Sequence, residues 1–283
     1  MSVIFISILV LTSIALIASI VLYIALRRFH VKEDERVLLV ENVLPSVNCG
    51  GCGFAGCKAF AEACVKASSL ESLNCPVGGK DTMFQIADIL GQEAVEQVEQ
   101  IAVVRCNGSC ANRERKNTYD GVLNCAIAAS LYAGETDCSY GCLGYGDCVE
   151  ACMFDAIFIN PETKLPEVDE EKCTACGACV KACPKDIIEL RKKGPRSRRI
   201  YVSCVSKDKG ATARKACAVA CIACGKCEKV CAFDAITIVN NLAYIDADAC
   251  RLCRKCVSVC PTNAITELNF LIKQTEKKAE VVL

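Results

Sequence analysis

The chain opens with a long apolar run, and every later hydrophobic segment is short. Residues 3–26 carry no charge and are rich in Ile, Leu, Val and Ala. As a helix, the run spans roughly 36 Å at 1.5 Å per residue, which is enough to cross a bilayer with some tilt. A cleaved signal peptide is the alternative, but no basic segment precedes the run and no small-residue cleavage site follows it. The pattern therefore predicts a permanent single-pass anchor over residues 1–29.

Basic residues follow the apolar run directly. Arg27, Arg28 and Lys32 come next, and an excess of Lys and Arg marks the cytoplasmic side of a transmembrane helix. We therefore expect the bulk of the chain on the cytoplasmic side of the membrane. The cytoplasm is reducing, so cysteines there stay available for metals and disulfides are disfavoured.

Three later segments have a recognisable period. Residues 84–103 place apolar side chains at helical spacing and predict a packing helix. These side chains are Ile86, Ile89, Leu90, Val95, Val98 and Ile101. Residues 58–68 predict another helix, on which Cys64 would be a packed thiol. Residues 236–239 and 242–245 predict a β-hairpin around a turn-forming Asn-Asn pair. Short helices mixed with hairpins indicate the α+β class.

Cysteine content changes this picture more than periodicity does. The chain has 26 Cys in 283 residues, with one His and no Trp. Such a density indicates a disulfide scaffold, zinc sites or iron–sulfur ligation. Disulfide scaffolds are normally short chains, and one His cannot serve several mixed zinc sites. Basic and acidic residues balance at 33 each, and clusters held by thiolates add negative charge, so nucleic acid is not an expected partner.

The first cysteine group lies in a small domain at residues 30–80. Cys49, Cys52, Cys57 and Cys75 follow the spacing C-x2-C-x4-C-x17-C, which supplies four thiolates for one 4Fe–4S cluster. The glycines among them let a ligand loop bend closely around the cluster and point N–H groups at its sulfurs. Three of these glycines also spell G-x-G-x-x-G. We reject a dinucleotide site, because no strand precedes the motif and cysteines occupy its interior.

Three further runs have the spacing C-x2-C-x2-C-x3-C of bacterial ferredoxins, in which the fourth Cys ligates the other cluster of a pair. The runs are Cys173, Cys176, Cys179 and Cys183; Cys221, Cys224, Cys227 and Cys231; and Cys250, Cys253, Cys256 and Cys260. The flanking residues recur as well, since Phe-Asp-Ala-Ile begins at Phe154 and again at Phe233. Repeated ligands with repeated flanks indicate duplicated half-repeats that function in pairs.

The partner of the 173–183 run is altered. Its cysteines, Cys138, Cys142, Cys148 and Cys152, align with Cys217, Cys221, Cys227 and Cys231. Tyr145 stands where Cys224 would be, so this half-repeat has lost one ligand. Cys138, about one helical turn before Cys142, is the expected substitute. The alternative is a three-iron cluster or a ligand from elsewhere.

Pairing the half-repeats predicts two tandem ferredoxin-like modules, at 135–190 and 203–270, each with two clusters between hairpins and helices. One module would use Cys138, Cys142 and Cys148 with Cys183, and Cys173, Cys176 and Cys179 with Cys152. The other would use Cys221, Cys224 and Cys227 with Cys260, and Cys250, Cys253 and Cys256 with Cys231. With the first group this gives five clusters, and metal ligation would supply much of each module's folding free energy.

Residues 81–134 form a helical middle region with cysteines of its own. Cys106, Cys110 and Cys125 offer three ligands for a sixth cluster, and the alternative is thiols that only hold structure. Cys106 follows Val104-Arg105, and Cys204 follows Val202-Ser203. Each precedes a module, which suggests equivalent positions in the repeat. The sequence assigns no ligand role to Cys204 or Cys217.

A basic segment separates the two modules. Residues 191–202 begin with Arg-Lys-Lys-Gly-Pro-Arg-Ser-Arg-Arg. A solvated, flexible linker is the simpler interpretation. A docking patch for an acidic ferredoxin or for anionic lipid is the alternative. Residues 271–283 form a C-terminal tail.

The order of these motifs is similar to that of one known family. An anchor, then Cys-Gly-Gly-Cys-Gly-Phe-Ala-Gly-Cys with a distant Cys-Pro, then Cys-Ser-Tyr-Gly-Cys-Leu-Gly-Tyr-Gly-Asp-Cys and ferredoxin repeats, closely resembles the B subunit of the Rnf complex in its long form. The resemblance implies a membrane complex that oxidises ferredoxin, reduces NAD+ and pumps Na+ or H+. This chain would be its iron–sulfur arm at the bacterial inner membrane. Soluble ferredoxin would be the donor, and other Rnf subunits the partners.

No complete active site is visible in this chain alone. It shows no flavin, nicotinamide or Walker motif, and one uncharged helix cannot form an ion path by itself. It would conduct electrons as a subunit of an oxidoreductase. The main alternative is an Fe–S carrier of another membrane enzyme, such as a formate or carbon monoxide dehydrogenase assembly, which the first cysteine group disfavours. A membrane-bound redox sensor would need an output domain, and a structural zinc protein is the weakest alternative.

Overall fold

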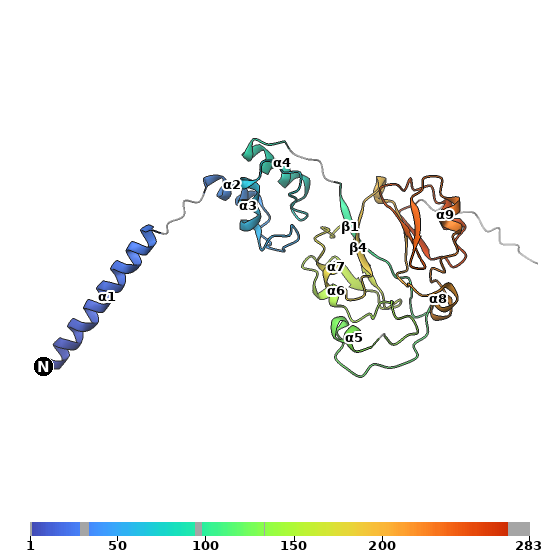
Figure 1. Ribbon diagram of the computed structural model, residues 1–283, viewed down its shortest axis with the longest axis horizontal. Helices are drawn as coiled ribbons and strands as arrows, with labels where there is room; N and C mark the ends of the chain where they lie inside the picture. The colour runs from blue at the N-terminus through green and yellow to red at the C-terminus, as the bar shows by residue number, and fades with distance from the viewer. Residues whose placement is uncertain (1, 29–33, 94–97, 133, 271–283) are drawn as a thin grey trace, which may run out of the picture.

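The computed structural model describes residues 2–28, 34–93, 98–132 and 134–270 (Figure 1). Helix α1, Ser2–Arg28, contains an apolar segment, Ile4–Ala25, that is long enough to cross a membrane and is not buried against the rest of the chain. An apolar helix surface of this length is suited to lipid rather than to water. The helix therefore fits the expected membrane anchor. Lys32 and the predicted tail at 271–283 lie outside the described residues.

Three helices form a small domain around the first cysteine group: α2 (Glu35–Val43), α3 (Cys57–Lys66) and α4 (Gly79–Leu90). The Asp34 carboxylate accepts a hydrogen bond from the backbone N–H of Arg36 (3.0 Å) and so caps α2. The side chains at the centre of the domain are almost completely buried, and they are Val40, Phe60, Cys64 and Ile86. Cys64 is thus a packed thiol, as the sequence predicted.

The helix predicted over residues 84–103 is shorter than expected, and a strand follows it. Helix α4 ends at Leu90, because Gly91 adopts a left-handed conformation (φ 63°) at its C-terminus. Strand β1, Gln100–Val104, contains three consecutive buried residues, Ile101, Ala102 and Val103. Consecutive buried side chains, two of them β-branched, suit a strand covered on both faces. Val95, which belonged to the predicted helix, lies outside the described residues.

Each ferredoxin-like module contains two two-stranded antiparallel sheets and several short helices (Figure 1). In the first module β1 pairs with β4 (Ile188–Lys192) and β2 (Ile157–Ile159) pairs with β3 (Pro166–Val168), alongside α5 (Cys125–Leu131), α6 (Asp147–Glu150) and α7 (Ala178–Ala182). The 3₁₀ turn η1 (Pro195–Ser197) leads into the second module. There β5 (Arg199–Val202) pairs with β8 (Ile265–Leu268) and β6 (Ile236–Val239) pairs with β7 (Leu242–Ile245), alongside α8 (Gly210–Ala216), α9 (Lys226–Val230) and α10 (Lys255–Ser258).

One of the predicted boundaries changes with these pairings, and one predicted hairpin is confirmed. The first module was expected to begin at residue 135, but it takes β1 from the middle region as a sheet partner of β4. The β6–β7 hairpin is the one predicted, and Asn240 and Asn241 form its turn with φ values of 51° and 59°. Positive φ at both central residues is the requirement of a type I′ turn, which explains the Asn-Asn pair.

Both ends of the segment predicted as a flexible basic linker, 191–202, belong to sheets. Arg191 lies in β4 and Arg199 in β5, and each is only 4% exposed. The Arg191 guanidinium donates hydrogen bonds to the carbonyl oxygens of Ile200 (3.3 Å) and Ile245 (2.6 Å). These two acceptors belong to the second module, so a side chain from the first module joins the two. Neither arginine is solvated or free to dock a partner.

Candidate iron–sulfur sites

The four half-repeats share one backbone conformation. In each, the residues on either side of the second cysteine position have positive φ values, between 52° and 93°. These pairs are Gly144 and Gly146, Ala175 and Gly177, Ala223 and Gly225, and Leu252 and Arg254. Left-handed residues turn the chain sharply, which lets the loop wrap around a central hollow. The first pair flanks Tyr145, so Tyr145 occupies the place of the second cysteine, as the alignment predicted.

Four hollows in the structure are each lined by four cysteines. The sets are Cys49, Cys52, Cys57 and Cys75; Cys152, Cys173, Cys176 and Cys179; Cys221, Cys224, Cys227 and Cys260; and Cys125, Cys142, Cys148 and Cys183. The first three are the sets expected from the spacing, including the exchange of the fourth cysteine between half-repeats. The cysteines of the fifth expected set influence one another. Burial raises the pKa of Cys250, and the charges of Cys253 and Cys231 raise it further. Burial also raises the pKa of Cys256 to about 12, and the charges of Cys250 and Cys253 contribute.

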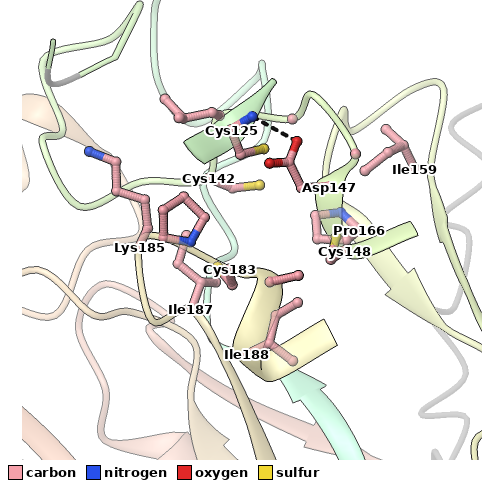
Figure 2. Close-up of a pocket in the computed structure, with 15 residues that line it drawn as sticks. Cys125, Cys142, Asp147, Cys148, Ile159, Pro166, Cys183, Lys185, Ile187 and Ile188 are labelled. Atoms are coloured by element: carbon pink, nitrogen blue, oxygen red, sulfur yellow. Dashed lines mark hydrogen bonds between the residues drawn. The ribbon is translucent and has the colours of Figure 1, made fainter. Parts of the chain in front are cut away.

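The hollow between α5, α6 and α7 differs from the expectation in one ligand. Cys125, the first residue of α5, lines it with three of the expected cysteines, whereas Cys138 is not among its lining residues (Figure 2). The Asp147 carboxylate accepts hydrogen bonds from the backbone N–H groups of Cys125 (2.7 Å) and Ala126 (3.0 Å). A carboxylate on the first N–H groups of a helix holds that end in place. Asp147 therefore positions the Cys125 thiol at this hollow.

Aromatic packing explains why α5 reaches this hollow. The hydroxyl oxygens of Tyr145 and Tyr132 lie 3.2 Å apart. Tyr132 in turn stacks on Tyr119, with ring centres 5.0 Å apart. Tyr132 follows α5 directly, so Tyr145, which stands in place of a cysteine, packs against the segment that carries Cys125.

A comparison within the sequence argues against Cys138 as the substitute. Its equivalent in the regular half-repeat is Cys217, and that half-repeat already has its ligands without Cys217. A cysteine that is surplus in the regular copy is a poor candidate to replace a missing ligand in the altered one. No spacing rule points to Cys125 instead, because its position depends on the tertiary packing of α5.

The electrostatics of the sets fit iron–sulfur clusters. Burial, assisted by neighbouring cysteine charges, raises the pKa of Cys142, Cys148 and Cys256 to about 12. Such thiols become thiolates when a metal centre compensates the charge. Among the residues that the structure describes, no three Cys, His, Asp or Glu side chains lie close enough to share a single metal ion. The thiols instead surround hollows, which suits a group of several atoms such as a 4Fe–4S cluster.

Backbone N–H groups point at ligand sulfurs. The N–H of Gly78 lies 3.3 Å from the Sγ atom of Cys75, and the N–H of Ala264 lies 3.3 Å from the Sγ atom of Cys260. Hydrogen bonds to cluster sulfurs favour the more negative state and are one of the protein's means of setting a reduction potential. The loops therefore supply both ligands and potential-tuning donors.

The ligand loops of the first domain and the first module touch. A methyl group placed on Gly51 would lie 3.0 Å from both the Cβ atom and the carbonyl oxygen of Cys176. Only a residue without a Cβ atom allows this approach without a shift of the neighbour. Gly51 lies between Cys49 and Cys52 in sequence, and Cys176 lines the hollow of the first module that α7 borders. Two of the sets are therefore neighbours across a domain boundary.

Comparison with known families agrees with these sites. Residues 137–187 and 220–264 match the family described as a 4Fe-4S dicluster domain, and residues 172–235 match a second family with the same description. Residues 44–77 match a family described as a putative Fe-S cluster. Together with the fold and the thiol sets, these matches define a multi-cluster iron–sulfur electron-transfer protein.

The relatives of the chain narrow this class to one family. It is 49% identical over 233 residues to the B subunit of the Na(+)-translocating ferredoxin:NAD(+) oxidoreductase complex of Acetobacterium woodii, across 82% of this chain and 68% of the relative. It is 42% identical over 237 residues to the B subunit of the proton-translocating ferredoxin:NAD(+) oxidoreductase complex of Clostridium ljungdahlii, across 84% and 82%. The B subunit of the ion-translocating oxidoreductase complex of Methanosarcina acetivorans is 40% identical over 242 residues, across 86% and 90%. The chain belongs to this family, the B subunits of Rnf complexes.

Proposed function

We propose that the chain carries electrons within a membrane-bound, Na+- or H+-translocating oxidoreductase, from reduced ferredoxin to partner subunits that reduce NAD+. The observation that carries the proposal is that sixteen cysteines line four hollows in sets of four, while Cys231, Cys250, Cys253 and Cys256 make up the remaining expected set. Five 4Fe–4S clusters held by these sets would supply one-electron transfer. The chain's own residues hold the clusters, exclude water from them and set their potentials. Hydride chemistry and ion movement belong to the other subunits.

Helix α1 supports a single-pass attachment with the cluster-bearing domains in the cytoplasm. Its apolar segment Ile4–Ala25 has the length of a membrane span. Arg27 and Arg28 lie in its last turn, and basic residues at a helix end favour the cytoplasmic side. A reducing compartment also keeps the cysteines available for clusters.

The contact between Gly51 and Cys176 supports an order for the sets. It places the domain next to the membrane anchor beside the first module. Within each module, each half-repeat supplies its fourth cysteine to the set of the other half-repeat. The two sets are therefore joined through the protein backbone. An electron that enters at the second module would therefore leave through the first domain, near the membrane subunits.

The second module supports docking of the donor. Among the five sets, Cys224 and Cys253 are the exposed ligands. Arg251, Arg254 and Lys255 surround Cys253 in sequence and are exposed as well. A ferredoxin carries the negative charge of its own cluster, and a positive rim raises its rate of encounter. The sequence suggested the segment 191–199 as a docking patch, but its Arg191 and Arg199 are buried. We therefore assign the docking role to the surface around Cys253.

Charge reversal tests this docking surface. The double substitution Arg251→Glu and Lys255→Glu is expected to slow reduction of the chain by ferredoxin by roughly tenfold at low salt, because electrostatic steering is lost. The matched control is Lys66→Glu on α3, whose side chain is 77% exposed and distant in sequence from the second module. An unchanged rate in the double variant would refute this docking surface. Wild-type protein that ferredoxin cannot reduce would refute the donor itself.

A further inference from the structure

Four cysteines outside the five sets hold equivalent places in the two modules. Cys106 follows the end of β1 by two residues, and Cys204 follows the end of β5 by two residues. Cys138 and Cys217 each precede the first cysteine of their run by four residues. The duplication thus gives each module one thiol after its first strand and another before its first ligand.

Hydrogen bonds between the modules bring the two strand ends together. The backbone N–H of Asn107 donates to the carbonyl oxygen of Ser203 (3.2 Å). The buried guanidinium of Arg105 reaches across the same boundary and donates to the carbonyl oxygen of Cys204 (3.4 Å). Because Asn107 and Arg105 flank Cys106, these contacts place Cys106 beside Cys204.

The loop that follows Cys106 also reaches the second module. The backbone N–H of Ala218 donates to the carbonyl oxygen of Asn112 (2.8 Å), which holds this loop against the residue after Cys217. A methyl group placed on Gly108 would lie 3.5 Å from the Sγ atom of Cys217. The loop therefore passes directly over the Cys217 thiol.

The side chain of Arg113 joins the Cys217 and Cys138 segments. A methyl group placed on Gly108, the position that approaches the Cys217 thiol, would lie 3.1 Å from the Cδ atom of Arg113. The Arg113 guanidinium donates hydrogen bonds to the Thr136 hydroxyl oxygen (3.4 Å) and to the carbonyl oxygen of Cys142 (2.5 Å), on either side of Cys138 in sequence. The Cys138 and Cys217 segments therefore meet at one guanidinium, a counter-charge suited to an anionic centre.

We propose that Cys106, Cys138, Cys204 and Cys217 ligate a sixth 4Fe–4S cluster at the junction of the two modules. The site borders a set on each side. Cys138 and Cys217 lie four residues before Cys142 and Cys221, which belong to sets of the first and second module. The ligand set stands on this geometry, while its role rests on the proposed electron-transfer function. In that role the site relays single electrons, supplied by reduced ferredoxin, between the modules without making or breaking a bond.

Cys110 is the competing fourth ligand. It lies four residues after Cys106 and borders a groove that Cys138 also lines. Its side chain is exposed, however, whereas Cys204 is only 9% exposed. The sequence-based set of Cys106, Cys110 and Cys125 is revised accordingly, because Cys125 lines a hollow of the first module.

Iron and acid-labile sulfide per chain test the assignment on anaerobically purified, full-length protein. The wild type is expected to hold about twenty-four irons, four for each of six clusters. Cys106→Ala and Cys204→Ala are each expected to lower the count by about four, because a cubane that loses one of four thiolates is released. Cys110→Ala is the matched control and is expected to leave the count unchanged.

Three results would refute the sixth site, its ligand set or the proposed donor, respectively. A wild-type count of about twenty would overturn the sixth site without recourse to any variant. A loss of iron in Cys110→Ala together with a full count in Cys204→Ala would overturn the ligand set. A full count in protein that ferredoxin does not reduce would leave the site standing and refute only the proposed donor.

Discussion

Replacing Gly51 by Ala is predicted to loosen the contact between the first domain and the first module. The added methyl group would lie 3.0 Å from the Cβ atom and carbonyl oxygen of Cys176 and 3.1 Å from its Cα atom. Two of these three atoms are backbone and cannot rotate away. Overpacking of this kind costs about 1–3 kcal/mol, which makes the docked arrangement roughly 5- to 150-fold less favourable. The φ of Gly51 lies outside the left-handed region, so Ala adds no backbone strain.

Freeze-quenched EPR during reduction by ferredoxin measures the consequence. In Gly51→Ala, electrons are expected to reach the first domain more slowly, while the two modules are reduced at the wild-type rate. Gly53→Ala is the control in the same loop: its φ is 87° and nothing lies within 4 Å of an added methyl group. It costs about 1 kcal/mol of local strain but leaves the contact free. Wild-type electron arrival in Gly51→Ala, with unchanged hydrogen-exchange protection at Cys176, would refute the contact.

Three further outcomes follow from the buried groups. Cys125→Ala is expected to remove about four irons per chain. Adding Tyr145→Cys should restore them, because it recreates the regular cysteine spacing. A double variant that stays iron-poor would contradict the position assigned to Tyr145. Arg191→Leu is expected to lower the free energy of unfolding in denaturant by about 3–5 kcal/mol, since it leaves buried partners unpaired. The control Arg196→Lys, at an exposed position, should change this free energy by less than about 0.5 kcal/mol. Equal effects of the two substitutions would mean that Arg191 does not join the modules. Anaerobic removal of iron by an oxidant and a chelator is expected to unfold both modules, as seen by circular dichroism, because ligation supplies much of their stability; a native spectrum after removal would exclude this.

Features set by neighbouring residues were predictable from the sequence. The β6–β7 hairpin depends on two short strands and the Asn240-Asn241 turn, all within ten residues of each other. The regular cysteine runs each have positive φ values on both sides of the second cysteine, so one local spacing gives one loop conformation. The burial of Cys64 follows in the same way from the apolar face of α3. Short-range patterns of this kind fix local structure whatever the rest of the chain does.

Features set by distant contacts were missed for a physical reason. Arg191 stands in a run of basic residues that is typical of a solvated segment, but its guanidinium binds the carbonyl oxygen of Ile245, 54 positions away. Cys125 is held at its hollow by Asp147, 22 positions away. Strand β1 was assigned to a helix because its pairing with β4 is invisible to local periodicity. Such contacts arise only when the modules pack, so spacing alone does not reveal them.

Reduction by ferredoxin tests most directly whether this chain conducts electrons through iron–sulfur sites. Visible absorbance and EPR are recorded on anaerobic, full-length protein before and after reduced ferredoxin is added, with metal analysis on the same sample. We predict at least about twenty irons per chain and loss of the visible absorbance on reduction, with new EPR signals from reduced clusters. Zinc in place of iron, or iron-loaded protein whose spectra ferredoxin leaves unchanged, would contradict the proposed function.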